Sequence, residues 1–261
     1  MITIQINNKK TYTYNNFDDI TSLNNFYYIT YIDCSHNQLT TLPQLQCNSN
    51  GTLPNSLQKL YCWNNQLIIL QQLLNSLQQL YCFNNQLTTI PQLQCNSNGT
   101  LPNSLQKLYC WNNQLIILQQ LPNSLQELYC NSNQLTTLPQ LQCNSNGTLP
   151  NSLQELYCEY NQLTALPQLP NSLQRIVSSH NQLTILPQLP NSLRYLICNN
   201  NLFKIKYTKS KHKYNIKTKK NNNDKQFIND VQCGYLDSSY HPRKTFCIEK
   251  LMFSYDYLFS D

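Results

Sequence analysis

The sequence predicts a solenoid dominated by β structure, and three observations support this prediction. "LPNSLQKLYCWNNQL" occurs twice without a change, at residues 53–67 and 101–115 of the 261-residue chain. Alignment on the Asn of "NQL" gives a single frame, L-x-x-L-x-C-x-x-N-x-L-x-x-L-P, throughout the middle of the chain. Within that frame, Leu and Cys of "LYC" alternate with the two-residue period of a β-strand. Self-similarity at a fixed period indicates an architecture of stacked repeats.

The frame occurs in eight units that span residues 29–205. The first Leu-type position of units 1 to 8 falls at Ile29, Leu57, Leu77, Leu105, Leu125, Leu153, Leu173 and Leu193. The steps between these positions are 28, 20, 28, 20, 28, 20 and 20 residues. Residues 43–73 are identical to residues 91–121, which indicates that a 48-residue block was duplicated.

Each unit is expected to contribute one short strand and one extended return segment. Leu and Cys of "LYC" should lie on one face of the strand, with Tyr between them on the other face. The following "LPQLP" cannot form a helix interior, because Pro lacks a backbone donor and restricts the residue before it. An extended or polyproline-like return is therefore predicted.

This frame resembles the leucine-rich repeat in its short, Pro-containing form. The resemblance covers about two thirds of the chain and implies an α/β-type solenoid dominated by β structure, with a parallel concave sheet and extended or polyproline-like convex returns. The phrase "LPNSLxxLYCxxNQLTxLPQLP" is similar to repeat proteins of large amoeba-infecting DNA viruses. Bacterial secreted leucine-rich effectors share the same short repeat. The viral resemblance implies a role inside an infected host cell.

One asparagine recurs in every unit, and the resemblance implies that its buried amide binds the backbone of the turn. A turn that leaves a sheet exposes peptide groups, and an amide can both donate to them and accept from them. We therefore expect a structural ladder rather than a catalytic set. Its members are Asn37, Asn65, Asn85, Asn113, Asn133, Asn161, Asn181 and Asn201.

Seven cysteines occupy the inward strand position, and Ser178 takes the equivalent place in unit 7. Free Cys behaves as a small buried hydrophobe, which suits a narrow core. Metal sites favour clustered pairs such as C-x-x-C, which the chain lacks, so we expect no metal and no cofactor. The start of the chain lacks the apolar core of a signal peptide, which disfavours disulfides.

The outward strand positions carry a row of aromatic residues that the core does not dictate. Aromatic side chains with a polar tip are frequent anchors of protein interfaces. The alternative is that Tyr is a good strand former and was copied with its block. Charged residues, among them Lys59 and Glu127, should edge this row. The candidate binding residues are Tyr61, Trp63, Tyr81, Phe83, Tyr109, Trp111, Tyr129 and Tyr157.

Three segments lie outside the repeats, and the 28-residue units carry inserts. Residues 1–28 are expected to cap the first unit, with a strand in "MITIQI" and a short helix in "DDITSLNNF". Residues 206–225 should form a basic linker and residues 226–261 a capping or interaction segment. The inserts, which carry Cys47, Cys95 and Cys143, are expected to be surface loops, with or without a binding role.

Charge separates the functional hypotheses. Residues 1–202 hold six basic and six acidic side chains, so the net charge of +6 comes from residues 203–261. Nucleic acid or an anionic surface could therefore bind only through the Lys-rich residues 204–225. A protein or peptide partner, expected to come from a host cell, is favoured for the repeats.

No catalytic motif is present, and we expect no enzyme. Only 59 residues follow Leu202, too few for the separate cysteine-dependent ubiquitin-ligase domain that some effectors carry. A role as a substrate adaptor for host ubiquitin transfer stays open. The chain has no apolar run long enough for a membrane span, and an intracellular, cytoplasmic location is expected.

Overall fold

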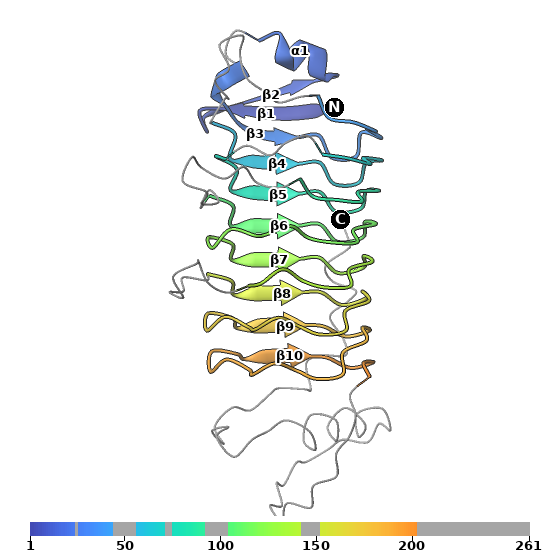
Figure 1. The fold of residues 1–261 in the computed structure, drawn as a ribbon. Coiled ribbons are helices and arrows are strands. Elements are labelled where there is room, and N and C mark those ends of the chain that lie inside the picture. The colour runs from blue at the N-terminus through green and yellow to red at the C-terminus, as the bar shows by residue number, and fades with distance from the viewer. Residues whose placement is uncertain (24–25, 44–55, 71–74, 92–103, 142–151, 203–261) are drawn as a thin grey trace, which may run out of the picture.

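The chain folds into a stack of coils in which every unit adds one strand to the same sheet (Figure 1). The computed structural model describes residues 1–23, 26–43, 56–70, 75–91, 104–141 and 152–202. The predicted linker at 206–225, the C-terminal segment at 226–261 and the three inserts lie outside the described residues. One ten-stranded sheet has the order β10-β9-β8-β7-β6-β5-β4-β3-β1-β2. The predicted β-dominated solenoid is confirmed.

The eight repeat strands pair in parallel, and the seven after the first have three residues each. Equivalent residues lie opposite one another, as Leu60 pairs with Leu80 and Leu80 with Leu108. The units therefore stack without a slip in register. The strands are β3 (Ile29–Asp33), β4 (Lys59–Tyr61), β5 (Gln79–Tyr81), β6 (Lys107–Tyr109), β7 (Glu127–Tyr129), β8 (Glu155–Tyr157), β9 (Arg175–Val177) and β10 (Tyr195–Ile197).

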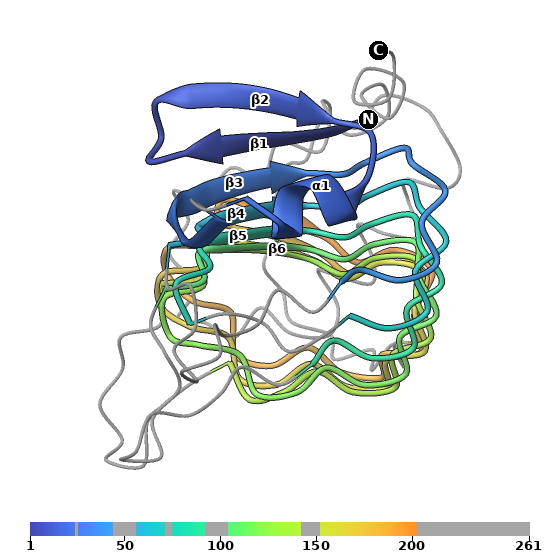
Figure 2. The same ribbon diagram turned by 90° about the horizontal axis from the view of Figure 1, so that it is seen from above.

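The N-terminal residues form a hairpin, a short helix and a 3-10 turn before the first coil. The strand expected in "MITIQI" is β1 (Ile2–Ile6), which pairs antiparallel with β3. The sequence did not predict β2 (Lys10–Tyr14), the second strand of this hairpin. The helix α1 (Phe17–Thr21) begins one residue before "DDITSLNNF" and ends earlier, and η1 (Phe26–Tyr28) follows it. Figure 2 shows α1 over the end of the coils.

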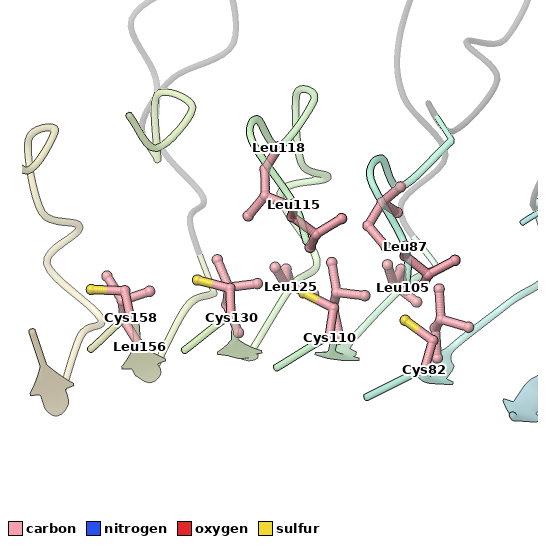
Figure 3. Close-up of a cluster of buried hydrophobic side chains, with 14 of the residues drawn as sticks. Cys82, Leu87, Leu105, Cys110, Leu115, Leu118, Leu125, Cys130, Leu156 and Cys158 are labelled. Carbon is pink, nitrogen blue, oxygen red and sulfur yellow. The ribbon is translucent and has the colours of Figure 1, made fainter. Parts of the chain in front are cut away.

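The core is a ladder of inward-pointing Leu and Cys side chains between the sheet and the returns (Figure 3). No described residue of the returns is helical, as the prolines predicted. The seven repeat cysteines are free thiols with at most 2% of their surface exposed. Burial raises the pKa of the Cys110 thiol from 9.0 to about 12, so the thiol stays protonated and unreactive at neutral pH. The predicted packing role of these cysteines is confirmed.

Candidate binding face

The outward side chains of β4 to β8 form one row of five tyrosines. Each Tyr lies directly opposite the Tyr of the next strand, because the parallel pairing is in register. Trp63, Phe83 and Trp111 follow the buried Cys of units 2, 3 and 4 and form a second row. We call these two rows together the aromatic face: Tyr61, Trp63, Tyr81, Phe83, Tyr109, Trp111, Tyr129 and Tyr157.

The rings stack face to face from Tyr61 to Tyr129 in the first row and from Trp63 to Trp111 in the second, whereas Tyr157 is tilted by 44° against Tyr129. The ring centroids of Tyr61 and Tyr81 lie 4.3 Å apart with an angle of 1° between the planes, and those of Tyr81 and Tyr109 lie 4.3 Å apart at 5°. In the second row, Phe83 stacks on Trp63 at 5.0 Å and on Trp111 at 3.7 Å. The stacks arise because the strand spacing of about 4.8 Å is close to the distance of ring stacking.

The two rows touch at unit 4, where the centroids of Tyr109 and Trp111 are 5.8 Å apart. All eight rings are half-buried, chiefly because each covers the face of its neighbour. Solvent therefore meets the ring edges and phenol oxygens rather than the ring faces. A nucleobase needs an open ring face for stacking, and the interior of these rows offers none.

Three of the five phenol hydroxyls donate to the residue that begins the next strand. Tyr61 donates to Gln79 Oε1 at 2.8 Å, Tyr109 donates to Glu127, and Tyr129 donates to Glu155 Oε2 at 2.6 Å. These donors are thereby committed, and the lone pairs of the phenol oxygens are left as acceptors. The glutamates were predicted only as flanking charges, although their position before the Leu of the next unit was a usable signal for this bond.

Glu127 and Glu155, which accept from the tyrosines, also form ion pairs with basic side chains. Lys107 Nζ lies 2.9 Å from Glu127 Oε1, and Arg175 Nε lies 3.8 Å from Glu155 Oε1. Arg175 also donates to the Tyr157 hydroxyl at 3.3 Å and lies over the ring of Tyr195. The mixed charges predicted to edge the aromatic row thus form pairs across neighbouring units. These pairs orient the glutamates toward the tyrosines.

Burial is the largest cause of raised pKa values along the tyrosine row. It raises the pKa of Tyr61 from 10.0 to about 12, with added repulsion from Tyr81 and Asp33. Burial and the acceptor Glu127 together raise the pKa of Tyr109, and burial and Glu155 raise that of Tyr129. The face is therefore made of neutral phenols over the whole physiological range of pH.

The last ring of the aromatic face is Tyr157 in unit 6. Val177 and Ile197 replace Tyr at the outward position of β9 and β10. In the second row, Asn131 and the buried Glu159 and Ser179 follow Trp111. Aromatic doublets of Tyr with Trp or Phe are therefore confined to units 2 to 4.

The eight ladder asparagines lie at the turns that follow the strands, and the seven from Asn65 to Asn201 each join two units. Asn65 Oδ1 accepts from the N–H groups of Asn37 and Leu39 at 3.0 and 2.9 Å. Its Nδ2 donates to the carbonyl oxygens of Cys34 and Cys62 at 2.9 and 3.1 Å. The other members from Asn85 to Asn201 donate to backbone carbonyls in the same manner. Asn37 instead donates to the carbonyl oxygens of Met1 and Ser35.

Two further structural rows were missed. The serine of "NSL" donates to the previous unit, as Ser76 Oγ does to the Leu57 carbonyl at 2.8 Å, and its regular recurrence was a usable signal. The residue before each ladder asparagine has a positive φ, for example 50° at Asn64 and 53° at Tyr160. Asn adopts this left-handed conformation more readily than most residues. "NN" in units 2 to 4 was therefore a signal for the turn.

Within the described residues, no group of three or more His, Cys, Asp or Glu side chains could hold a metal ion. The same part of the chain contains no helix that is long and apolar enough to cross a membrane.

Comparisons with known proteins agree with this geometry. The family described as "Leucine Rich repeats (2 copies)" matches residues 123–171. The leucine-rich-repeat domain of a Shigella effector is 25% identical with a TM-score of 0.50, over 67% of this chain and 70% of that domain. YopM from Yersinia enterocolitica WA-314 is 31% identical with a TM-score of 0.48, over 66% of this chain. The chain spans 38% of the length of that YopM. No curated protein matches the sequence.

Proposed function

We propose that this leucine-rich-repeat solenoid is a non-enzymatic interaction module that binds a protein or peptide through its aromatic face. Leucine-rich repeats generally serve as protein-interaction modules, and the family matches two of the units. Similarity to a Shigella effector domain supports a partner in a host cell. The resemblance to viral repeat proteins stays a prediction, and it points to the same cellular setting.

The stacking of the rings is the observation that carries this proposal. The rings of Tyr61, Tyr81 and Tyr109 are held parallel by their neighbours, so their side chains have little rotamer freedom left to lose on binding. Preorganisation of this kind lowers the cost of association. Rigid aromatic anchors at the centre of a surface are typical of protein-binding hot spots.

The chemistry of the face favours a protein partner over nucleic acid. Its ring faces are covered by neighbouring rings, so bases cannot stack between them. Its exposed edges are apolar, and its phenol oxygens can accept hydrogen bonds from the N–H groups of an extended peptide. We expect the strongest contacts at units 2 to 4, where both aromatic rows are present.

The test is selection of binding peptides from a displayed random library, followed by affinity measurement with purified variants. We expect the double variant Tyr81→Ala with Tyr109→Ala to weaken binding of the selected peptides at least tenfold. Ile116→Ala with Ile117→Ala is the matched control, because these exposed side chains lie on the return and not on the sheet. The proposal fails if both double variants bind equally well, or if the control alone loses binding.

A further inference from the structure

The ten-stranded sheet has an open edge at β2. β2 pairs with β1 on one side, and it is the terminal strand of the sheet. Four of its five side chains, Lys10 to Thr13, are exposed, with 38% of Tyr12 accessible. Figure 2 shows β2 on the far side of β1 from the coils. An exposed edge strand presents unpaired backbone groups that can bind a further strand.

The hydrogen bonds of β1 show which groups of β2 point outward. Asn7 donates its N–H to the Tyr28 carbonyl, and the Gln5 carbonyl accepts from Thr30 Oγ1, so the odd-numbered residues of β1 face β3. The even-numbered residues therefore face β2, where Ile4 pairs with Tyr12. Since backbone groups alternate in direction along a strand, those of Tyr12 point toward β1. The backbone N–H and C=O groups of Thr11 and Thr13 therefore point away from β1, toward the open edge of the sheet.

The sequence of β2, KTYTY, is self-complementary in the antiparallel direction. If Tyr12 lies opposite Tyr12 of a second copy, Thr11 of each copy lies opposite Thr13 of the other. All the outward N–H and C=O groups of Thr11 and Thr13 are then paired, whereas registers centred on Thr11 or Thr13 leave some unpaired. Lys10 lies opposite Tyr14, so no like charges meet, and Thr–Thr and Tyr–Tyr pairs are favourable across strands.

We propose that two copies of the chain associate through β2, with antiparallel pairing centred on Tyr12, to form one continuous sheet. This contact is isologous, so it closes on itself and gives a dimer rather than a filament. Its two-fold axis is perpendicular to the sheet, and the outward faces of both copies therefore point to the same side. The dimer presents two aromatic faces to a common partner and increases avidity without any new contact to that partner.

The surface involved is small. A pair of five-residue strands buries well under the roughly 1,600 Å² of a standard interface, so the dimer is expected to be weak and dependent on concentration. This inference does not rest on the proposed binding function, because it uses the edge of the sheet and leaves the aromatic face free.

Sedimentation velocity of the full chain tests the proposal over a concentration range up to about 0.5 mM, where weak interfaces become populated. The wild-type mass should rise toward twice 30.5 kDa. The variant T11K/T13K should stay at 30.5 kDa over the same range, because each Lys would face another Lys. A wild-type chain that stays monomeric, or a T11K/T13K chain that still doubles its mass, overturns the proposal.

Charge-swapped variants test the register and control for folding. T11K/T13E places Lys opposite Glu in the proposed register and should keep the mass doubling. T11K/T13K and T11E/T13E should each be monomeric alone but should associate when mixed in equal amounts. All variants should unfold close to the wild-type temperature, because the side chains of Thr11 and Thr13 are exposed and the bond that Gln5 Nε2 of β1 donates to Thr11 Oγ1 is long, at 3.4 Å. Failure of the mixed pair to associate overturns the proposed register.

Discussion

The coils that carry β4, β5 and β6 and those that carry β9 and β10 bury nearly the same side chains on the inward side of the sheet but carry different ones on its outward side. Leu80 and Ile176 are both fully buried, and Cys82 and Ser178 occupy the same inward position with no exposed surface. On the outward side, the first region carries stacked Tyr, Trp and Phe, whereas the second carries Val177, which is 4% exposed, and the half-buried Ile197. The inward rows are needed for stacking. The outward rows are free to differ, and the proposed binding function assigns specificity to them.

The largest expected effect is alkaline unfolding, because burial raises the pKa values of the tyrosines of the aromatic face and of the inward thiols. The folded pKa of Tyr61 is about 12 and the ordinary value is 10.0. The inward thiols have an ordinary pKa of 9.0, which burial raises to about 12 at Cys110. Stability is therefore complete below pH 9 and is lost as the pH rises toward 12. Far-UV circular dichroism between pH 8 and 12 should show cooperative loss of the sheet. Full stability at pH 12 would contradict this account.

The second prediction compares the loss of stability when one ladder asparagine in each region is replaced with an apolar side chain of similar size. Asn113→Leu and Asn181→Leu should each cost about 3 kcal/mol, because several buried backbone groups lose their partner. Gln114→Leu, next to the ladder on an exposed position, should change stability by less than about 0.5 kcal/mol. Urea denaturation measures all three. A large loss at only one of the two asparagines would mean that the inward rows are not equivalent.

A smaller effect is expected from exchanging the inward residues of the two regions. Cys110→Ser should cost about 1 kcal/mol, because a hydroxyl must be buried where a thiol was. Ser178 already forms a hydrogen bond of 3.4 Å to the Ile197 carbonyl. Ser178→Cys loses this long hydrogen bond but replaces a buried hydroxyl with a less polar thiol. The substitution should therefore be neutral or slightly stabilising in urea denaturation. Strong destabilisation by Ser178→Cys would show that the core of unit 7 differs from the others.

The smallest expected effect concerns the turns between the two regions. Ser132 has a φ of 52°, where units 2 to 4 place Asn. Ser132→Gly should stabilise the chain by about 0.5 kcal/mol, because glycine adopts this conformation without a steric penalty. Thermal unfolding should show a small rise in midpoint. A lower midpoint would indicate that the flexibility of glycine in the unfolded chain outweighs the relief of strain.

The repeated rows were predictable from the sequence, because period and burial follow from stacking alone. Leu, Cys and Asn recur at fixed positions, and the Leu and Cys of each strand are buried in every unit where they occur. The partners of the outward groups were not predictable, since they depend on contacts between units. The hydrogen bond from Tyr129 to Glu155, for example, joins residues that are 26 positions apart. Because the first six units alternate between 28 and 20 residues in length, the separation between bonded residues also changes from one unit to the next. β2 was missed because its side chains are exposed and lack an apolar pattern.

Thiol labelling tests the inward register of the repeats most directly, because a slip of one residue in a strand turns every side chain to the opposite face. The five cysteines outside the described ranges would be replaced by Ser, which leaves the seven buried ones. Mass spectrometry after incubation with iodoacetamide should then show no label on the native chain and seven labels in urea. Rapid labelling of several thiols without denaturant would contradict the account.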